Sequence, residues 1–156
     1  MANVQGMCTS FKKELLCGSH ALGTQAANGV RTVTTKDVIK AALMLKTGTQ
    51  GLTTTAYAAT DELAASGNYA RDTMVVTNAT EPATNTVIAF WTPSASIAWG
   101  NLTSSGTFDC VLLYNASSTG KLAISVHTFS DQNISGGTFT LTMPSNDMTN
   151  GLIRIA

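Results

Sequence analysis

Apolar and polar residues alternate along most of the chain, which is the pattern of half-buried β-strands. The alternation is clearest where Phe139, Leu141 and Met143 face one way and three threonines face the other. Residues 107–114 are apolar on both faces, which indicates a central strand, or one covered by a subunit or by the N-terminal segment. The pattern predicts strands over residues 73–77, 86–91, 96–99, 107–114, 121–129, 138–143 and 152–155, with a further short edge over 30–35.

One N-terminal segment departs from this alternation. Phe11, Leu15 and Leu16 lie on one face at helical spacing. The predicted helix spans about residues 10–17, with Thr9 or Ser10 as its N-cap and Gly18 at its end. A helix this short is unstable alone in water, so it must dock on the chain's own sheet or on a neighbouring subunit.

Two further segments are less regular. Residues 37–46 are rich in Ala and Leu and could form a helix, but the turn residues on both sides favour a buried strand. Residues 48–71 are rich in Thr, Ala and Gly, and are expected to form a long ordered loop with at most one short strand.

The whole pattern predicts a mainly β fold in one domain over residues 1–156, with an N-terminal segment over residues 1–20. Many short strands separated by turns favour a β-sandwich with a jelly-roll or immunoglobulin-like path and one short N-terminal helix. Charged residues make up 12% of the chain, about half the usual share. A weakly charged, Thr-rich surface gives little protection against association, so we expect a homo-oligomer or a role inside an assembly.

Charge and hydropathy also exclude several classes of partner. The net charge is zero, and Lys12 and Lys13 are the only adjacent basic pair, so no nucleic acid is expected to bind. The longest apolar run, residues 41–45, is far too short to span a membrane. The first residues lack a secretory signal pattern, so synthesis in a reducing cytoplasm is expected.

Candidate chemistry is sparse. His20 and His127 lie far apart in sequence, without Cys or carboxylates at metal-ligand spacing, so no metal or other cofactor is expected. Cys110 shares a strand face with apolar residues and is interpreted as a core residue. The adjacent acidic pair Asp61 and Glu62 is interpreted as a solvated loop tip. With no catalytic motif in the chain, no catalytic residue and no enzymatic activity are predicted.

Aromatic residues offer one alternative. Tyr57 and Tyr69 in the 48–71 loop could contact a glycan, together with Trp91 and Trp99, as in a lectin-like sandwich. The simpler interpretation is that both tryptophans anchor the core of adjacent strands.

Several segments, in order along nearly the whole chain, resemble a family of small tailed-phage proteins. Members begin with an F-K-x-E-L-L-x-G-x-H element, carry a T-A-Y-x-A-T-x-E segment in a Thr-rich loop, and end in I-I-R-I-A. The matching segments here are residues 11–20, with Lys13 and Cys17 among its variable positions, residues 55–62 and residues 152–156. An Ala-Leu strand at residues 40–45 and a Tyr-Asn strand end at residues 111–115 complete the resemblance.

This resemblance implies a structural protein of a phage virion, most simply a capsid decoration, cement or knob protein. It would bind the major capsid protein or other virion proteins on the outside of the head. The residues predicted to form the interface are Phe11, Leu15, Leu16, Ile153 and Ile155. The alternatives are a neck or tail component present in few copies, and a glycan-binding module for the host surface.

Overall fold

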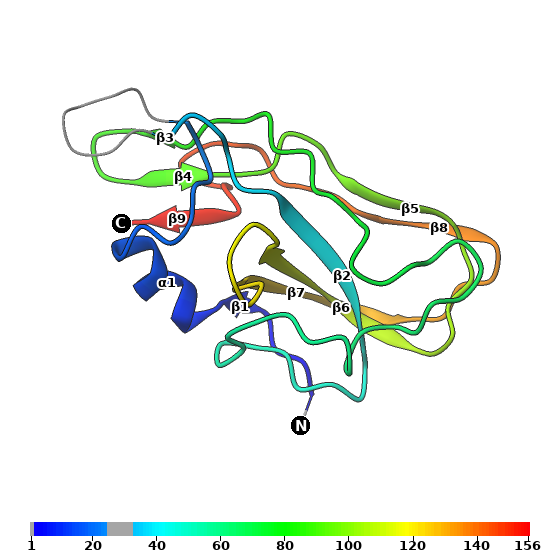
Figure 1. Cartoon of the computed structure of the whole chain (residues 1–156). Coiled ribbons are helices and arrows are strands. Elements are labelled where there is room, and N and C mark those ends of the chain that lie inside the picture. The colour runs from blue at the N-terminus through cyan, green and yellow to red at the C-terminus, as the bar shows by residue number, and fades with distance from the viewer. Residues whose placement is uncertain (1, 25–32) are drawn as a thin grey trace.

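The computed structural model describes residues 2–24 and 33–156 (Figure 1). The chain is mainly β with one short helix, as the alternation of apolar and polar residues predicts. The elements in chain order are β1 (Gly6–Met7), α1 (Thr9–Leu16), β2 (Ile39–Leu45), β3 (Ala83–Thr84), β4 (Ala89–Trp91), β5 (Ile97–Leu102), β6 (Phe108–Asn115), β7 (Ala123–Gln132), β8 (Gly137–Leu141) and β9 (Ile153–Ile155).

The largest sheet is antiparallel, with the strand order β1-β7-β6-β2. Strand β6 lies between β7 and β2, and seven of its eight residues are buried. Its apolar residues on both faces predicted such a central position. The sheet also resolves the ambiguity of residues 37–46, because β2 pairs with β6 from Ile39 opposite Asn115 to Leu45 opposite Phe108.

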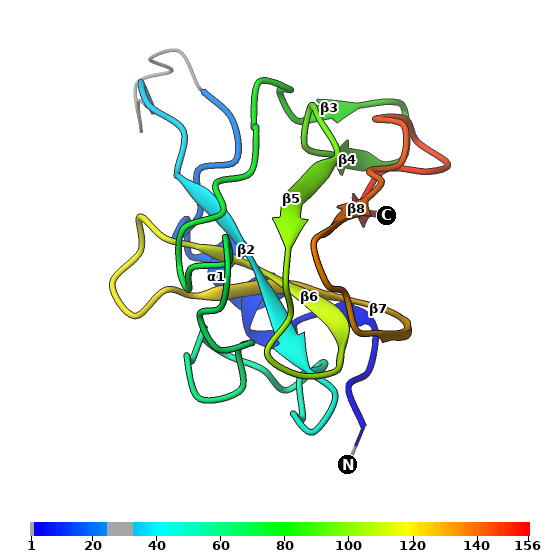
Figure 2. The ribbon, with the colours of Figure 1, turned by 90° about the vertical axis from the view of Figure 1, so that its right-hand side faces the viewer.

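Two smaller sheets, β3-β4-β9 and β5-β8, complete the fold. Phe139 of β8 packs against Phe108 of β6 and Phe129 of β7, with ring centroids 5.2 and 4.8 Å apart. The β5-β8 pair is thereby fixed to the four-stranded sheet. Figure 1 shows β3, β4 and β9 at the end of the molecule that carries α1, with β5 and β8 toward the other end. Figure 2, in which this other end faces the viewer, shows β5 beside β8.

The N-terminal helix docks on the chain's own sheet. Phe11 is fully buried, and α1 contacts β7. Gly18 adopts φ 69° and its N–H donates to the Leu15 carbonyl, while Ser19 N–H donates to Glu14, which together form a Schellman motif. Gly18 therefore ends the helix as predicted. The predicted N-cap is wrong, because Cys8 occupies that position and no side chain caps the helix.

The segment between β2 and β3 contains isolated β-bridges but no strand, and these bridges attach it to the sheet at single points. Glu62 bridges Met44, and Val75 bridges Lys40. The strand predicted over residues 73–77 is therefore wrong, since one bridge replaces a ladder there. The edge predicted over residues 30–35 falls partly outside the described residues. The two-residue strands β1 and β3 were not predicted.

Candidate functional site

The residues predicted to form an interface divide into two groups. Phe11 is 0% exposed and Ile153 is 3% exposed, so both belong to the hydrophobic core. Phe11 packs edge-to-face on His20, with ring centroids 4.7 Å apart. These two side chains are already covered by the chain's own fold, so they leave little surface for a partner.

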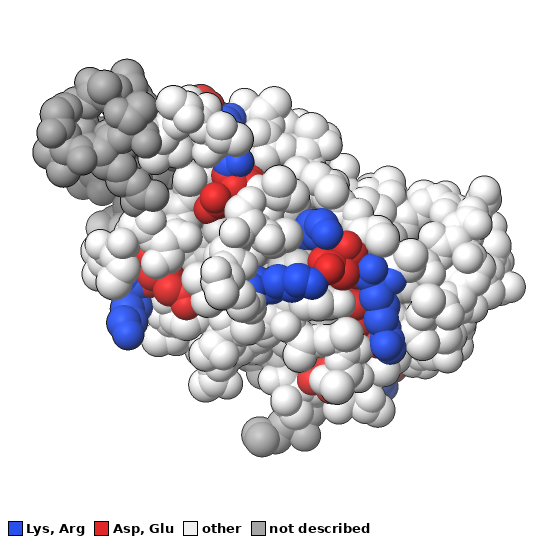
Figure 3. Space-filling view, viewed as in Figure 1, with Lys and Arg blue, Asp and Glu red and all other residues white. Residues whose placement is uncertain are grey.

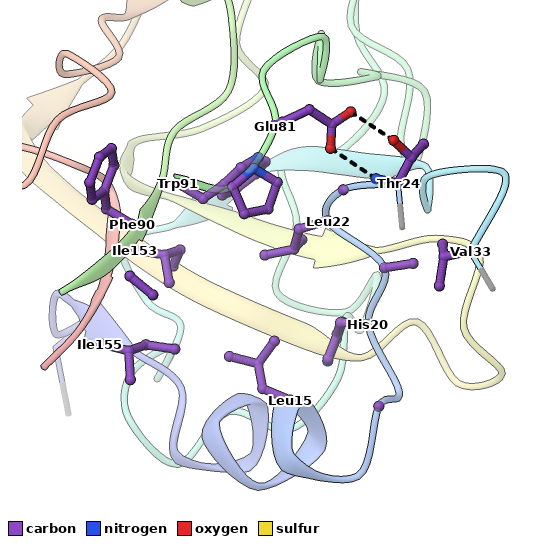
Figure 4. A pocket seen from close by; sticks show the side chains of 15 residues that line it. Leu15, His20, Leu22, Thr24, Val33, Glu81, Phe90, Trp91, Ile153 and Ile155 are labelled. Atoms are coloured by element: carbon purple, nitrogen blue, oxygen red, sulfur yellow. Dashed lines mark hydrogen bonds between the residues drawn. The ribbon is translucent and has the colours of Figure 1, made fainter. Parts of the chain in front are cut away.

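Leu15, Leu16 and Ile155 remain at the surface. Leu16 is 91% exposed and Ile155 is 49% exposed, whereas Leu15 is half-buried. Phe11 is the one buried residue of the helix, so Leu15 packs against the edge of the core and Leu16 is left outside it. Figure 4 shows Leu15 on α1 and Ile155 on β9 lining the same hollow.

Two adjoining hollows lie beside these residues, and we call them together the α1/β9 groove. The first has a volume of about 550 Å³ and the second about 410 Å³. The first is lined by apolar residues from α1, β4, β9 and the segment after the helix, among them Leu15, Leu22, Trp91, Ile153 and Ile155. The second is lined by Met7, Lys12, Leu15, Leu16, Arg154, Ile155 and Ala156. The groove is therefore mainly apolar, with two cations at one end.

Charges elsewhere form small groups of mixed sign. On the face seen in Figure 3, acidic and basic side chains lie together and large areas between them carry no charge. At the far end of the first hollow, Glu81 is paired with Lys36 at 2.7 Å and accepts hydrogen bonds from Thr24. This pairing neutralises the carboxylate beside the first hollow.

A second cluster joins all three tyrosines of the chain to two carboxylates. Glu62 accepts hydrogen bonds from the hydroxyls of Tyr57 and Tyr69, the latter at 2.7 Å. Asp72 accepts one from Tyr114 at 2.6 Å. Tyr57 also stacks on Tyr114, with ring centroids 4.4 Å apart. We call these five residues the tyrosine–carboxylate cluster; it connects the 48–71 loop to β6.

Two lysines extend this cluster. Lys121 and Lys40 donate to Asp72 at 2.5 and 3.2 Å. Burial alone would raise the pKa of the Asp72 carboxyl, but the hydrogen bonds from Lys121, Tyr114 and Lys40 outweigh it and lower the pKa to about 2. Burial, with a hydrogen bond to Glu62, raises the pKa of Tyr57 and Tyr69. The tyrosines are therefore protonated donors and the Asp72 carboxylate is charged at neutral pH.

The cluster corrects two sequence interpretations. Glu62 is 1% exposed, so it is not part of a solvated loop tip. Tyr69 is buried, and both Tyr57 and Tyr69 use their hydroxyls on Glu62, so they do not form an exposed glycan platform. Trp91 and Trp99 are buried as core anchors, as their simpler interpretation predicts. The sequence signal for the cluster is the grouping of two tyrosines and a Glu within one polar loop, since a buried tyrosine hydroxyl needs a partner.

Neither histidine is arranged for catalysis. Ser125 Oγ lies 2.9 Å from His127 Nε2, but Ser125 is buried and burial lowers the pKa of His127 to about 4, so this imidazole is a weak base. In the described part of the chain no carboxylate bonds its other ring nitrogen. His20 instead joins Glu14 of α1, at 2.9 Å, to Asn115 of β6, at 3.1 Å. This second arrangement fastens the end of the helix to the sheet.

The buried cysteines are arranged as core residues. Burial raises the pKa of Cys8 to about 11 and that of Cys110 to about 12, so both thiols are protonated at neutral pH. Within residues 2–24 and 33–156, no group of three or more His, Cys, Asp or Glu side chains is placed to hold a metal ion.

No helix in those two ranges is long and apolar enough to cross a membrane. A scan against protein-family models, a search of curated proteins and a search of solved structures found no match to this chain.

Proposed function

We propose that this chain is a structural protein of a tailed-phage virion, a capsid decoration or cement protein that binds the outer face of the head. The observation that carries the proposal is the exposed apolar surface formed by Leu16 and Ile155 beside the α1/β9 groove. The ordered resemblance of several segments to small tailed-phage proteins supplies the virion context. The protein would brace capsid subunits without catalysing a reaction.

The energetics suit a protein that works in many copies. Burial of one exposed leucine or isoleucine side chain contributes about 1.5–3 kcal/mol. Leu16 and Ile155 together therefore give modest affinity at a single site, after the cost of association is subtracted. Repetition over a shell increases the effect if each copy contacts more than one capsid subunit. A preformed groove on a rigid sheet also loses little conformational entropy on binding.

The decisive experiment is a copy count of this chain in purified particles, by quantitative mass spectrometry against the major capsid protein. Copies in proportion to the capsid subunits are the expected result for a decoration protein. A count of about six or twelve, as a closed ring of subunits gives, would assign the chain to the neck or tail. Absence from the particle would refute the structural role.

A binding assay tests the surface itself. Purified protein is added to heads that lack it, and the bound fraction is measured by sedimentation. We expect Leu16→Asp to lose binding, because it places a charge where an apolar contact forms. Val87→Asp is the matched control, since Val87 is an exposed apolar residue in the β3–β4 connection, outside the groove. Equal binding by both variants would exclude this surface.

A further inference from the structure

Strand β9 has an edge that faces helix α1. In its sheet β9 pairs with β4, and no other described strand pairs with it. Figure 1 shows β4 on one side of β9 and α1 on the other. An edge of this kind presents backbone N–H and C=O groups that an added strand can bond. The edge therefore offers hydrogen bonds beside the apolar groove.

The α1/β9 groove follows this edge. Both of its hollows touch Leu15 and Ile155, so they adjoin along the strand. Ile153 and Ile155 are two positions apart and lie on one face of β9, the first buried and the second half exposed. A segment paired with β9 would place every second side chain on that face. Leu16 on α1 would then contact the segment from the opposite wall.

Positive charge marks one end of the groove. Lys12 and Arg154 line the second hollow, and in the described part of the chain neither forms an ion pair. The Arg154 guanidinium donates to the backbone carbonyls of Met148 and Thr149, so its charge is not neutralised there. Glu14, the acidic residue of α1, is bound to His20 and so does not pair with Lys12 or Arg154. Asp147 interacts electrostatically with Arg154 without forming an ion pair with it. An incoming carboxylate would therefore meet two cations that belong to no ion pair among the described residues.

The same charges argue against a second copy of this chain as the occupant. A two-fold pairing of β9 with β9 would bring Arg154 and Lys12 of one copy toward the same residues of the other, because such an interface is self-complementary by symmetry. Like charges brought together in this way oppose association. A partner with acidic side chains has no such penalty.

We propose that the free edge of β9 binds an extended segment of another protein, which adds to the β3-β4-β9 sheet as a further strand. The segment carries apolar side chains at alternate positions, for the groove, and at least one Asp or Glu, for Lys12 and Arg154. The identification of that protein as a capsid component rests on the proposed function. Because β9 has three residues, the pairing is short and each site is weak, which suits repeated binding on a shell.

The test begins with a displayed library of random peptides of about twelve residues, long enough to form a strand, selected on the full-length chain. We expect the selected peptides to show alternating apolar positions and an acidic residue. In ¹⁵N-labelled protein, a selected peptide should shift the amide resonances of residues 153–155 and of α1. Failure to select any peptide, or shifts confined to other residues, would overturn the proposal.

Backbone methylation then distinguishes strand pairing from apolar contact alone. Two versions of the selected peptide are N-methylated on alternate amides, one set in each. Since only alternate amides face the β9 edge, one version should bind roughly tenfold more weakly, as expected for about two lost hydrogen bonds, and the other should bind as before. Equal affinities for the two versions would exclude β-pairing.

Charge reversal tests the acidic contact. Lys12→Glu should weaken binding of the selected peptide. Replacing the acidic residue of the peptide by lysine should restore binding to that variant. Lys13→Glu is the control, because Lys13 does not line the hollow. If the wild-type chain forms a dimer and the Leu16→Asp variant does not, the occupant of the groove is instead a second copy of the chain. Peptide binding with no copies on the particle would refute only the proposed function, and abundant copies without groove binding would refute only this inference.

Discussion

At the scale of single residues, Asp72 carries the clearest electrostatic contribution to stability. Its carboxylate accepts hydrogen bonds from Lys121, Tyr114 and Lys40, and its pKa falls to about 2 from a usual 3.8. Because the pKa is lower in the folded chain than in the unfolded chain, this contribution is fully present above about pH 4 and is lost as the pH falls through about 2.

We therefore predict that Asp72→Asn lowers the free energy of unfolding by about 1–2 kcal/mol at pH 7, after allowance for partial solvent exposure. Asn is the suitable replacement because it tolerates the left-handed backbone at this residue, φ 57°. Urea unfolding at several pH values should show the difference shrinking between pH 4 and pH 2. A difference that stays constant with pH would contradict the assignment. Asp131→Asn, in the exposed pair with Lys46, should change little.

Glu62 is the other residue whose surroundings decide its role. Replacing it with Ala leaves the hydroxyls of Tyr57 and Tyr69 without their acceptor in a buried site. We predict a loss of about 2–4 kcal/mol in unfolding free energy, measured by urea denaturation. Hydrogen exchange should accelerate more in residues 48–71 than in β6, because the loop loses its connection to the sheet whereas β6 keeps its ladders with β2 and β7. Thr60→Ala, at an exposed position of the same loop, is the control.

At the scale of elements, α1 separates stability from surface function within about one and a half turns. Phe11 is fully buried and Leu16 is almost fully exposed. We predict that Phe11→Ala lowers the free energy of unfolding by about 3–5 kcal/mol, through lost burial and a cavity. Leu16→Ala should change it by less than about 0.5 kcal/mol. Thermal or urea unfolding of both variants measures this contrast, and equal losses would show that Leu16 packs in the core.

The elements also show how far the sequence predicts this fold. Strands β6, β7 and β8 follow their alternation because each pairs with its neighbour over most of its length, although register shifts interrupt the β6-β7 and β5-β8 ladders. β1 was missed because its two residues pair with Val126 and Ser125, far along the chain, and no local pattern encodes that pairing. Residues 73–77 alternate like a strand, but backbone bonds from Val76 to Ile39 and from Ala41 to Met74 flank a single bridge.

The candidate site was only partly predictable for a related reason. The apolar positions of α1 and β9 are visible in the sequence, and Leu15, Leu16 and Ile155 do lie beside one groove. The packing of α1 on β7 decides which of these apolar residues stay exposed, and that packing is a tertiary contact. Phe11 and Ile153 could therefore not be distinguished from their neighbours. The hydrogen bonds of Glu62 likewise depend on how the loop folds back on β2 and β6.

At the scale of the whole molecule, the described residues form a β-framework with an apolar groove beside α1 and β9, and the net charge of the chain is zero. Such a molecule would stabilise an assembly by bridging subunits that are already in place. If the chain is the decoration protein proposed above, phage heads that lack it should release their genome at a lower temperature than complete heads. Added protein should restore the release temperature in proportion to the number of copies bound, because each bound copy stabilises the closed shell by mass action.

The measurement is the temperature at which a DNA-binding dye first gains access to the genome. Leu16→Asp should leave the release temperature of deficient heads unchanged, because it folds but does not bind, whereas Val87→Asp should restore it as the wild type does. Restoration by Leu16→Asp would show that the protein binds through another surface. Deficient and complete heads that open at the same temperature would show that the protein does not brace the shell, even if it is present in many copies.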